Sequence, residues 1–383
     1  MIENEDADAV VVGGGPAGAA AALTLARAGA RTIVLERAPM PRDKVCGDLL
    51  GTDAVATLRR LGFPPSVLDG STRLTGAVLH GPHGATYGAL ATRERVPRAD
   101  DARVIPRERF DAALLAVSIA AGADVRYERA VTVIREPAGG AGDSVFAGVR
   151  TARTTLRARV VIGADGWGSL VARAFGAALP PERNVAVAAR AYAHGVRGLG
   201  SRMHFFINAA RDGYGWLFPL GDDGANVGLG FIRSEGPFDL AAAFERFRAP
   251  GSYAHAYLRD ATYTARAAWP IPLGPHSLRV ARPGALLAGD AAGFASPLSG
   301  SGIQHALASG DAAARFALRA LAGDGAAWRG YERWVARSVM IRLRAEAFAH
   351  RRFARASNVD RYAALTRISG GGAALSRAML ALG

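Results

Sequence analysis

The sequence contains almost no cysteine and almost no lysine: Cys46 and Lys44 are the only residues of their types among 383. A single cysteine cannot form an internal disulfide, and it cannot build a cysteine-rich zinc or iron–sulfur site. No apolar run approaches the ~20 residues that a membrane-spanning helix needs, and the first residues are acidic where a signal peptide is basic. We therefore expect a soluble cytoplasmic protein without a metal site.

The chain has an excess of positive charge, almost entirely arginine, with a net charge of +14. More than half of this excess follows Gly310, in a region whose apolar spacing predicts helices packed along one side. No nucleic-acid-binding signature accompanies the charge, so we expect no nucleic acid as a partner. An anionic membrane surface or an acidic carrier protein fits the charge better. The apolar residues of this region are Trp334, Ile341, Phe348 and Phe353.

Half of the residues are apolar, and a single core rarely grows beyond ~250–300 residues, so we expect two domains. A β-branched run at Asp8–Val12, a glycine-rich turn, a helix to about Ala28 and a strand at Arg31–Glu36 predict a β-α-β unit. Similar sequence returns at 284–290, after a stretch at 184–269 with the alternation of an antiparallel sheet. We predict an α/β fold: a discontinuous, Rossmann-like domain with an inserted, mainly antiparallel sheet and C-terminal helices.

The predicted domain bounds follow from these changes of pattern. We also expect antiparallel strands near 74–90, a helix at 110–121 and single strands at 125–135 and 155–162. The nucleotide-binding domain is predicted at 1–73, 101–165 and 279–325, the substrate-binding domain at 74–100 and 166–278, and a helical segment at 326–383.

Gly13, Gly15 and Gly18 form a G-x-G-x-x-G pattern at the turn between the first strand and helix. These glycines permit a tight turn, a close approach of the backbone to a pyrophosphate, and close helix–strand packing, while the helix N-terminus attracts phosphate. Glu36 ends the second strand, where a carboxylate can accept hydrogen bonds from ribose hydroxyls. This context predicts a bound dinucleotide, but the glycines do not distinguish NAD from FAD.

Two later segments favour FAD, because each ends an apolar strand with glycine and an aspartate, Asp165 or Asp290. Either could be an ordinary strand-to-turn aspartate. With the N-terminal glycines they resemble the two downstream motifs of the para-hydroxybenzoate hydroxylase superfamily of FAD enzymes. That resemblance implies that Asp290 contacts the ribityl chain and that Asp165 supports FAD near the pyrophosphate. Gly300–Ile303 then opens a helix whose amides can stabilise the N1–C2=O edge of a reduced flavin.

Two further motifs are Lys44-Val-Cys-Gly47 and Tyr214-Gly-Trp-Leu-Phe-Pro219, the latter followed by Gly228-Leu-Gly230. Together they resemble the geranylgeranyl reductase family, over about residues 9–310. The resemblance implies that the cysteine segment lies beside the isoalloxazine, that the aromatic motif lines an apolar substrate cavity, and that Arg107 contacts the flavin. The family's acidic residue in G-E-G-I is Ser301 here, which leaves the proton source open. The W-x-W-x-I-P motif of the halogenase relatives is absent.

Each of these residues also has a purely structural interpretation. Cys46 can be a small buried hydrophobe instead of a polarisable or proton-donating group at the flavin. Lys44 can be exposed instead of facing the flavin phosphates or the reduced flavin. Tyr214, Trp216 and Phe218 share one face of a strand, as core residues do, although a tyrosine could also bind or protonate a substrate.

The predicted site residues fall into three groups, and no metal ligands are predicted because His80 and His83 lie in a loop without further ligands. The candidate catalytic residues are Cys46 and Tyr214. The candidate substrate-binding residues are His204 and Phe206, expected on a strand beside the aromatic motif, with Tyr214, Trp216 and Phe218. The candidate FAD-binding residues are Gly13, Gly15, Pro16, Ala17, Gly18, Glu36, Arg37, Lys44, Cys46, Gly47, Arg107, Val131, Asp165, Gly289, Asp290, Gly300, Ser301, Gly302 and Ile303.

The family resemblance implies a reductase with tightly bound FAD that transfers hydride from N5 to a C=C bond of an apolar substrate, an isoprenoid or a specialised metabolite. Only one dinucleotide pattern is present, so NAD(P)H binds transiently or a separate reductase supplies the electrons. Two alternatives remain: an FAD-dependent monooxygenase that hydroxylates or epoxidises, and a non-redox, flavin-holding scaffold or cyclase. One fold serves all of these chemistries, so fold alone does not separate them.

Overall fold

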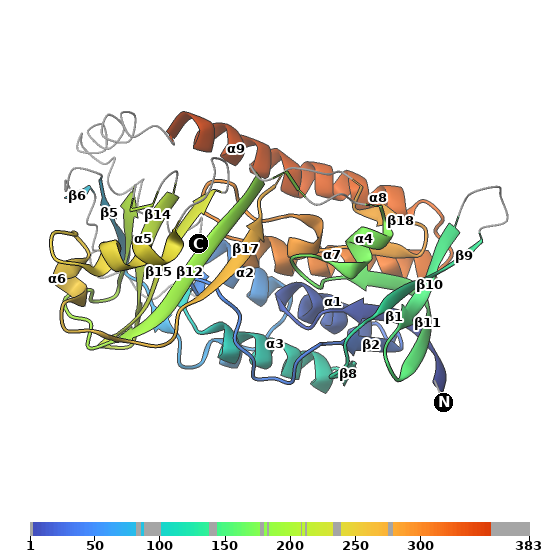
Figure 1. Cartoon of the computed structure of the whole chain (residues 1–383). Helices are drawn as coiled ribbons and strands as arrows, with labels where there is room; N and C mark the ends of the chain where they lie inside the picture. Colours follow the sequence, from blue (N-terminus) through green and yellow to red (C-terminus); the bar gives the residue numbers. More distant parts are fainter. Residues whose placement is uncertain are drawn as a thin grey trace.

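Two large β-sheets lie side by side along the molecule, with helices packed around the first (Figure 1). In the part of the chain that the structure describes, no helix combines the length and the apolar character needed to cross a bilayer. The computed structural model describes residues 3–81, 86–87, 101–137, 144–176, 180–181, 184–207, 209–210, 213–232, 239–274 and 279–353.

The first sheet has a parallel centre in the strand order β19-β11-β1-β2-β8. Its central strands are buried on both faces, which explains their unbroken apolar runs, such as Val10, Val11 and Val12 in β1. The strands come from three stretches of chain, as the return of Rossmann-like sequence predicted. They are β1 (Glu3–Val12), β2 (Thr32–Leu35), β8 (Asp124–Arg126), β11 (Thr154–Gly163) and β19 (Ala285–Leu287).

Antiparallel strands extend this sheet: β18 (Ala281–Arg282) pairs with β19, and β9 (Thr132–Pro137) and β10 (Ser144–Arg150) form a hairpin beside β11. The single strand predicted over 125–135 is therefore wrong. The structure has two strands there, β8 and β9, at different places in the sheet, because the chain turns away after Arg126.

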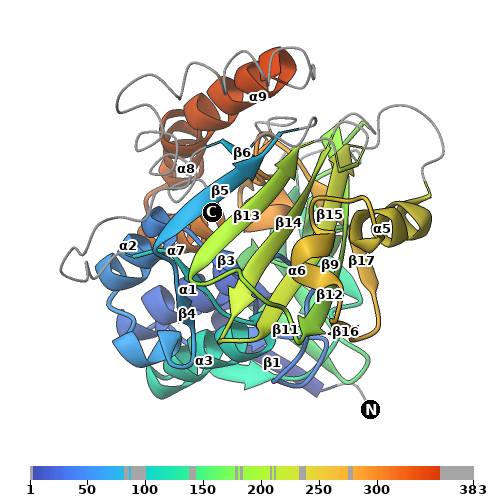
Figure 2. The same ribbon diagram turned by 90° about the vertical axis from the view of Figure 1, so that its left-hand side faces the viewer.

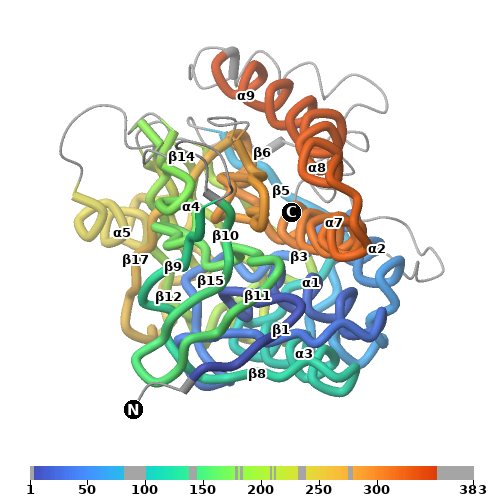
Figure 3. Tube along the Cα trace, turned by 90° about the vertical axis from the view of Figure 1, so that its right-hand side faces the viewer, coloured from blue at the N-terminus to red at the C-terminus, as the bar shows by residue number. Residues whose placement is uncertain are grey.

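Helix α1 (Pro16–Arg27) packs between α3 (Arg107–Ala120) and α7 (Ile303–Leu321), which bring together distant parts of the sequence (Figures 1 and 3). The contact with α7 is a backbone contact, since a Cβ on Gly310 would lie 2.1 Å from the carbonyl oxygen of Ala17. Glycine at this position therefore sets how closely the two helices approach.

The second sheet follows the order β16-β12-β15-β14-β13-β5-β6, with β17 also paired to β12 (Figure 2). It is antiparallel except that β5 runs parallel to β13, so the antiparallel pairing predicted near 74–90 holds only between β5 and β6. Helices α5 (Leu240–Arg248) and α6 (His255–Leu258) accompany it. Its strands are β5 (Gly76–His80), β6 (Thr86–Tyr87), β12 (Val185–His194), β13 (Arg202–Ile207), β14 (Gly213–Leu220), β15 (Gly224–Ile232), β16 (Thr262–Tyr263) and β17 (Ala267–Pro272).

A small antiparallel sheet, which the sequence did not predict, has the order β3-β7-β4. Its strand β3 comes shortly after the Lys44–Gly47 motif and leads into α2. The remaining short elements are β3 (Leu49–Leu50), β4 (Thr72–Arg73), β7 (Arg103–Val104), α2 (Thr52–Arg60), the 3-10 helices η1 (Pro65–Leu68) and η3 (Gly289–Ala292), and α4 (Leu170–Ala174).

The arginine-rich region forms α8 (Ala327–Val335), a π-helical turn (Ala336–Met340) and α9 (Ile341–Phe353). The helices were predicted, but the face that packs was not. Ile341 and Phe348 are 64% and 61% exposed, while Val339, Met340 and Leu343 are buried in the core. The extra residue in the π-turn rotates the following helix relative to a regular α-helix. Residues beyond 353, and His83, lie outside the described residues.

Candidate functional site

The glycine-rich turn after β1 leaves the N-terminus of α1 open to a ligand. Gly13 has a φ of 104°, and a Cβ there would lie 2.3 Å from the carbonyl oxygen of Ala164. A Cβ on Gly18 would lie 1.8 Å from the oxygen of Gly13, so the turn cannot accept side chains at either position. Pro16 begins a 12-residue helix without a side-chain cap, so its first amides are available to phosphate.

Glu36 is placed at the end of β2 as predicted, and its carboxylate is already held. It is 3% exposed, accepts a hydrogen bond from the Gly14 amide at 2.9 Å, and lies 3.1 Å from a guanidinium nitrogen of Arg42. Arg42 also pairs with Asp111 on α3 at 3.2 Å. A ribose at this site would therefore meet an oriented carboxylate beside a cation.

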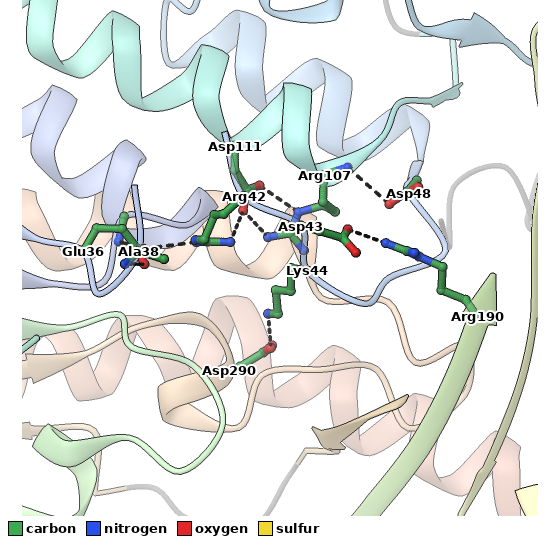
Figure 4. A network of polar contacts seen from close by, with 11 residues as sticks. Glu36, Ala38, Arg42, Asp43, Lys44, Asp48, Arg107, Asp111, Arg190 and Asp290 are labelled. Atoms are coloured by element: carbon green, nitrogen blue, oxygen red, sulfur yellow. Dashed lines mark hydrogen bonds and ion pairs between the residues drawn. The ribbon is translucent and has the colours of Figure 1, made fainter. Parts of the chain in front are cut away.

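The segment Arg42–Asp48, which contains the cysteine motif, is tied to several elements by its charged residues (Figure 4). Arg42 binds the end of β2 and α3, Asp43 pairs with Arg190 on β12, and Lys44 pairs with Asp290. We call Arg42–Asp48 the linking segment, because its ion pairs reach both large sheets.

Lys44 and Asp290, predicted separately as flavin contacts, form an ion pair of 3.1 Å in the structure. Asp290 lies in η3, and a Cβ on Gly302 would come within 3.2 Å of its carboxylate. Gly289 has a φ of 60°, and a Cβ there would meet Ala17 at 3.1 Å. The fold thus brings η3 to the start of α1 and to the turn that opens α7.

Arg107 lies inside the protein, 4% exposed, where two of its nitrogens bind the Asp111 carboxylate at 2.7 Å. The same guanidinium approaches the sulfur of Cys46, and its charge lowers the pKa of the thiol. Burial has the larger effect, so the pKa of Cys46 is raised above its ordinary value. As a whole residue, Cys46 is only partly buried.

Other predicted FAD-binding residues occupy varied environments. Asp165 uses both carboxylate oxygens at the start of α4, accepting from Ser169 at 2.5 Å and from the Leu170 amide at 2.6 Å. Val131 is 52% exposed. The guanidinium of Arg37 lies 5.7 Å from the ring centre of Trp269. Their contacts with FAD remain predictions.

The aromatic motif faces the linking segment and the turn before α7. Tyr214 donates a hydrogen bond to the carbonyl oxygen of Ser299, and a Cβ on Gly300 would lie 3.7 Å from the tyrosine oxygen. A Cβ on Gly47 would meet Phe218 at 2.9 Å and the indole nitrogen of Trp216 at 3.6 Å. Glycine at position 47 therefore lets the cysteine segment lie against the motif.

The predicted neighbour strand exists, but the predicted grouping of its residues needs correction. On β13, Phe205 pairs across the sheet with Trp216, and its ring centre lies 5.5 Å from that of Tyr214 and 5.2 Å from that of Phe218. His204 and Phe206 alternate with Phe205 and point to the opposite face, because successive strand residues alternate. They therefore lie on the other face of the sheet from the aromatic motif, and Phe205 is the residue of this run that shares its face.

Several contributing residues were missed by sequence reasoning. Asp48 directly follows the cysteine motif and could have been suspected from that position. Asn226 and Tyr192 carried no signal, because strands elsewhere contain similar isolated polar residues. Asp48 is fully buried and its carboxylate accepts hydrogen bonds of 2.8 Å from both Asn226 and Tyr192. The others that were missed are Arg42, Asp43, Asp111 and Arg190, which all form ion pairs in this network.

These residues fit FAD. The uncapped start of α1 suits a pyrophosphate, Glu36 suits a ribose, and the Lys44–Asp290 pair with the glycines of the Gly300–Gly302 turn suits the ribityl and flavin end. Within the described residues, no cluster of three or more metal-ligating side chains exists.

Comparisons with known proteins agree with this geometry. Residues 6–328 match the family model described as FAD binding domain. The chain is 34% identical over 324 residues to menaquinone reductase of Mycolicibacterium smegmatis, covering 81% of this chain and 76% of that protein. It is 31% identical over 326 residues to digeranylgeranylglycerophospholipid reductase 2 of Methanopyrus kandleri, covering 83% and 78%.

Among solved structures, a geranylgeranyl bacteriochlorophyll reductase-like protein of Thermoplasma acidophilum superposes with a TM-score of 0.83 at 26% identity, covering 94% of this chain and 91% of that one. The family resemblance inferred from the cysteine and aromatic motifs is therefore confirmed. The chain belongs to the FAD binding domain family and is an FAD-dependent oxidoreductase similar to geranylgeranyl reductases.

Proposed function

We propose that the enzyme reduces a C=C bond of an apolar, isoprenoid-type substrate. The observation that carries the proposal is the contact between the cysteine segment and the aromatic motif, in which Gly47 lies against Trp216 and Phe218. This places an apolar face beside the dinucleotide half of the molecule. The names of the relatives, which are reductases of menaquinone and of a digeranylgeranyl phospholipid, support the same substrate class.

In this proposal FAD supplies the hydride, and the chain orients the alkene and excludes water. Phe205, Tyr214, Trp216 and Phe218 provide a wall with few polar groups. The indole N–H of Trp216 is already bound to Asn226 at 2.8 Å, so it does not favour water at this face. Holding the reacting atoms about 3–3.5 Å apart is the main contribution that such a wall can make.

Cys46 is the proton donor in this proposal. Reduction of an alkene by hydride requires one proton on the second carbon, and Ser301 supplies no carboxylic acid. Burial keeps the thiol protonated, while the Arg107 charge and the Asp48 amide stabilise the thiolate left after transfer. The thiolate then regains a proton from solvent. Tyr214 stays protonated because burial raises its pKa, and it orients the Ser299–Gly300 turn.

The decisive experiment compares two oxidants of the reduced enzyme. The flavin is reduced without oxygen, and its reoxidation is followed first with a polyprenyl alkene and then with O2. Reoxidation by the alkene with formation of the saturated product supports the reductase. Rapid, substrate-stimulated consumption of O2 with an oxygenated product would instead establish the monooxygenase, which the missing carboxylate at Ser301 favours.

The roles of Gly15 and Cys46 can be tested separately. Gly15→Val should abolish FAD binding, measured by the flavin retained after gel filtration, because the branched side chain would occupy the approach to the pyrophosphate. Gly325→Val, at a glycine without a positive φ and with no atom within 4 Å of its Cβ, is a control far from the dinucleotide turn in the sequence. Cys46→Ala should retain FAD and lose turnover, and unchanged turnover would remove the proton-donor role. Reduction by NADH, NADPH or a ferredoxin system identifies the electron donor.

The partner proposed is an anionic membrane surface. Ile341, Arg344, Phe348 and Arg351 lie three or four residues apart and are all exposed, so they form one stripe along α9. Arg337, also exposed, lies in the π-turn just before this helix. The two apolar members of the stripe are the most exposed large hydrophobic side chains in the described part of the chain. Apolar groups interleaved with arginines suit insertion at a bilayer surface, with the guanidinium groups on lipid phosphates.

Vesicle sedimentation tests this surface. The protein should bind phosphatidylglycerol vesicles more tightly than phosphatidylcholine vesicles. Replacing Arg337, Arg344 and Arg351 by glutamine should weaken binding roughly tenfold or more. The triple variant Arg60→Gln, Arg129→Gln and Arg153→Gln removes the same charge from exposed positions elsewhere and should bind as the wild type does. An equal loss of vesicle binding in both triple variants would show that binding depends on net charge and not on the α9 surface.

A further inference from the structure

Asp48 adopts an unusual backbone conformation in a fully buried position. Its φ is 61°, which makes it the one residue other than glycine with a positive φ in the described chain, and its exposed fraction is 0%. A side chain in the left-handed region costs free energy and persists where its surroundings hold it. The contacts of its carboxylate show what holds it.

Three elements converge on this carboxylate. One oxygen accepts hydrogen bonds from the Tyr192 hydroxyl on β12 and from the Asn226 amide on β15, both at 2.8 Å. The other oxygen accepts from the Arg107 backbone amide, at the start of α3, at 3.3 Å. Asp48 therefore joins the end of the linking segment to both halves of the molecule.

Asn226 extends this contact to the cysteine. The indole N–H of Trp216 can only donate, so the Asn226 carbonyl oxygen faces it, at 2.8 Å. The amide nitrogen must then donate, and it does so to Asp48 and to the carbonyl oxygen of Cys46, each at 2.8 Å. A single buried side chain thus fixes the cysteine main chain relative to the aromatic motif, with Asp48 as its second acceptor.

Burial makes the ionisation of Asp48 sensitive to pH near neutrality. Burial raises its pKa to about 6, against the opposing effects of the hydrogen bonds from Tyr192 and Asn226 and of two arginines. Most neighbouring charges are already neutralised by partners. The groups that face it are Arg190 (paired with Asp43), Arg107 (paired with Asp111), Tyr192 and, on its own segment, Cys46. Lys44 acts on Cys46 and is paired with Asp290.

We propose that Asp48 is a positioning residue of the Cys46 site: its ionised carboxylate, through Asn226, holds the cysteine main chain against the aromatic motif, and protonation of the carboxylate releases that hold. Asp48 acts through Asn226 and contacts no substrate in this account. The effect on turnover rests on the proposed reductase, whereas the effect on the thiol does not.

The first test uses the fact that Cys46 is the only cysteine of the chain, so thiol alkylation reports on this site alone. The rate of iodoacetamide alkylation of the FAD-loaded, full-length protein is measured over a series of pH values. The negative charge of Asp48 raises the thiol pKa, so Asp48→Asn should move the alkylation midpoint to lower pH. Asp69→Asn removes an exposed carboxylate elsewhere and should leave the midpoint unchanged. Equal midpoints in Asp48→Asn and wild type would overturn the proposal.

The second test is the pH profile of turnover with pre-reduced enzyme. Wild-type turnover should fall as the pH drops through about 6, and Asp48→Asn should lose this acid limb. Tyr192→Phe removes a hydrogen bond that lowers the Asp48 pKa, so its acid limb should move to higher pH, while Tyr127→Phe, at a residue 47% exposed, should match the wild type. An acid limb unchanged in both Asp48→Asn and Tyr192→Phe would overturn the proposal. If no variant reduces an alkene, the proposed function fails, and the alkylation shift still decides the role of Asp48.

Asparagine tolerates the left-handed conformation better than most residues, so Asp48→Asn should fold. Tyr192→Phe is the milder second variant, because it removes a hydroxyl and keeps the ring beside Arg190, whose guanidinium lies 4.0 Å from the ring centre. A shift with both variants, in the directions given, supports the proposal.

Discussion

Both faces of the second sheet carry aromatic side chains, but the two faces lie against different parts of the molecule. One face, the motif face, carries Phe205 and the Tyr214–Phe218 aromatics and meets the cysteine segment. The other, the histidine face, carries His204 and Phe206 and packs against α5 and α6. Both faces follow the same two-residue alternation. Position relative to the dinucleotide half, not residue type, therefore separates a candidate site from ordinary core.

The faces also differ in how their buried titratable groups respond to pH. On the motif side, burial raises the pKa of Asp48 to about 6. On the histidine face, His80 and His204 lie 3.0 Å apart, and burial lowers their pKa values to about 4 and about 3. The carboxylate thus favours the folded state when protonated, and the histidines favour it when neutral. Stability on the two sides should change with pH in opposite directions.

The largest difference is expected from one glycine on each face. A Cβ on Gly228 would lie 2.0 Å from the ring of Trp216, on the motif face, and a Cβ on Gly215 would lie 2.7 Å from Phe247, on the histidine face. Gly228→Ala should displace Trp216 and lower turnover about 100-fold. Gly215→Ala should cost about 1–3 kcal/mol of stability with little effect on turnover. Steady-state rates and chemical denaturation of both variants decide this, and equal losses of turnover would break the comparison.

The next largest effect concerns acid stability of the histidine face. Unfolded histidines take up protons near pH 6.5, whereas the folded pair does not, so the free energy of unfolding should fall as the pH drops through 6.5 toward about 4. Between pH 7.5 and 5 each histidine should contribute a loss of roughly 2 kcal/mol. Urea denaturation should show a smaller loss in His204→Leu. Burial also lowers the pKa of His305 in α7 to about 4, so this residue should contribute to the pH dependence of unfolding that remains in His204→Leu. An identical slope in variant and wild type would contradict the buried-pair interpretation.

Asp48 should change the free energy of unfolding with pH in the opposite direction and by a similar amount. Its folded pKa of about 6 exceeds its unfolded value, so stability is lost as the pH rises from about 4 through 6. Asp48→Asn should therefore be about 2–3 kcal/mol more stable than wild type at pH 8, despite its altered active-site pH profile. Thermal or urea denaturation at pH 4 and pH 8 measures this. A variant that is less stable at pH 8 would show that the hydrogen bonds of the carboxylate outweigh its burial.

The smallest effect is expected from neighbouring phenylalanines on β13. Phe205→Leu removes contacts with Tyr214 and Phe218 and should raise the KM of an isoprenoid substrate roughly 2–10-fold, the range of an aromatic pair. Phe206→Leu removes contacts with His80 and Phe247 and should lower stability instead. Reversal of these two results would place the substrate on the histidine face, where His204 and Phe206 were first predicted to bind it.

Much of the dinucleotide half follows from the sequence. The turn at Gly13 and Gly18 tolerates no side chain, and the apolar strands around it must be buried, so local pattern and spacing are enough to identify them. The aromatic motif was recognised by its family resemblance, and alternation along one strand predicted that its side chains share a face. The strand beside it was also predicted, but its register was not, and a shift of one residue exchanges Phe205 for its neighbours.

By itself, the sequence determined the fold class and the family, and it singled out the neighbouring singletons Lys44 and Cys46 as candidate site residues. Only the tertiary structure decided their surroundings: Lys44 meets Asp290, 246 positions away in the chain, and the Cys46 carbonyl meets Asn226, 180 positions away. It likewise turned Ile341 and Phe348 outward, where the sequence had predicted a packed face. Motifs are local because a turn or strand imposes its geometry over a few residues. Partners across the fold depend on how whole sheets and helices pack, which local pattern does not specify.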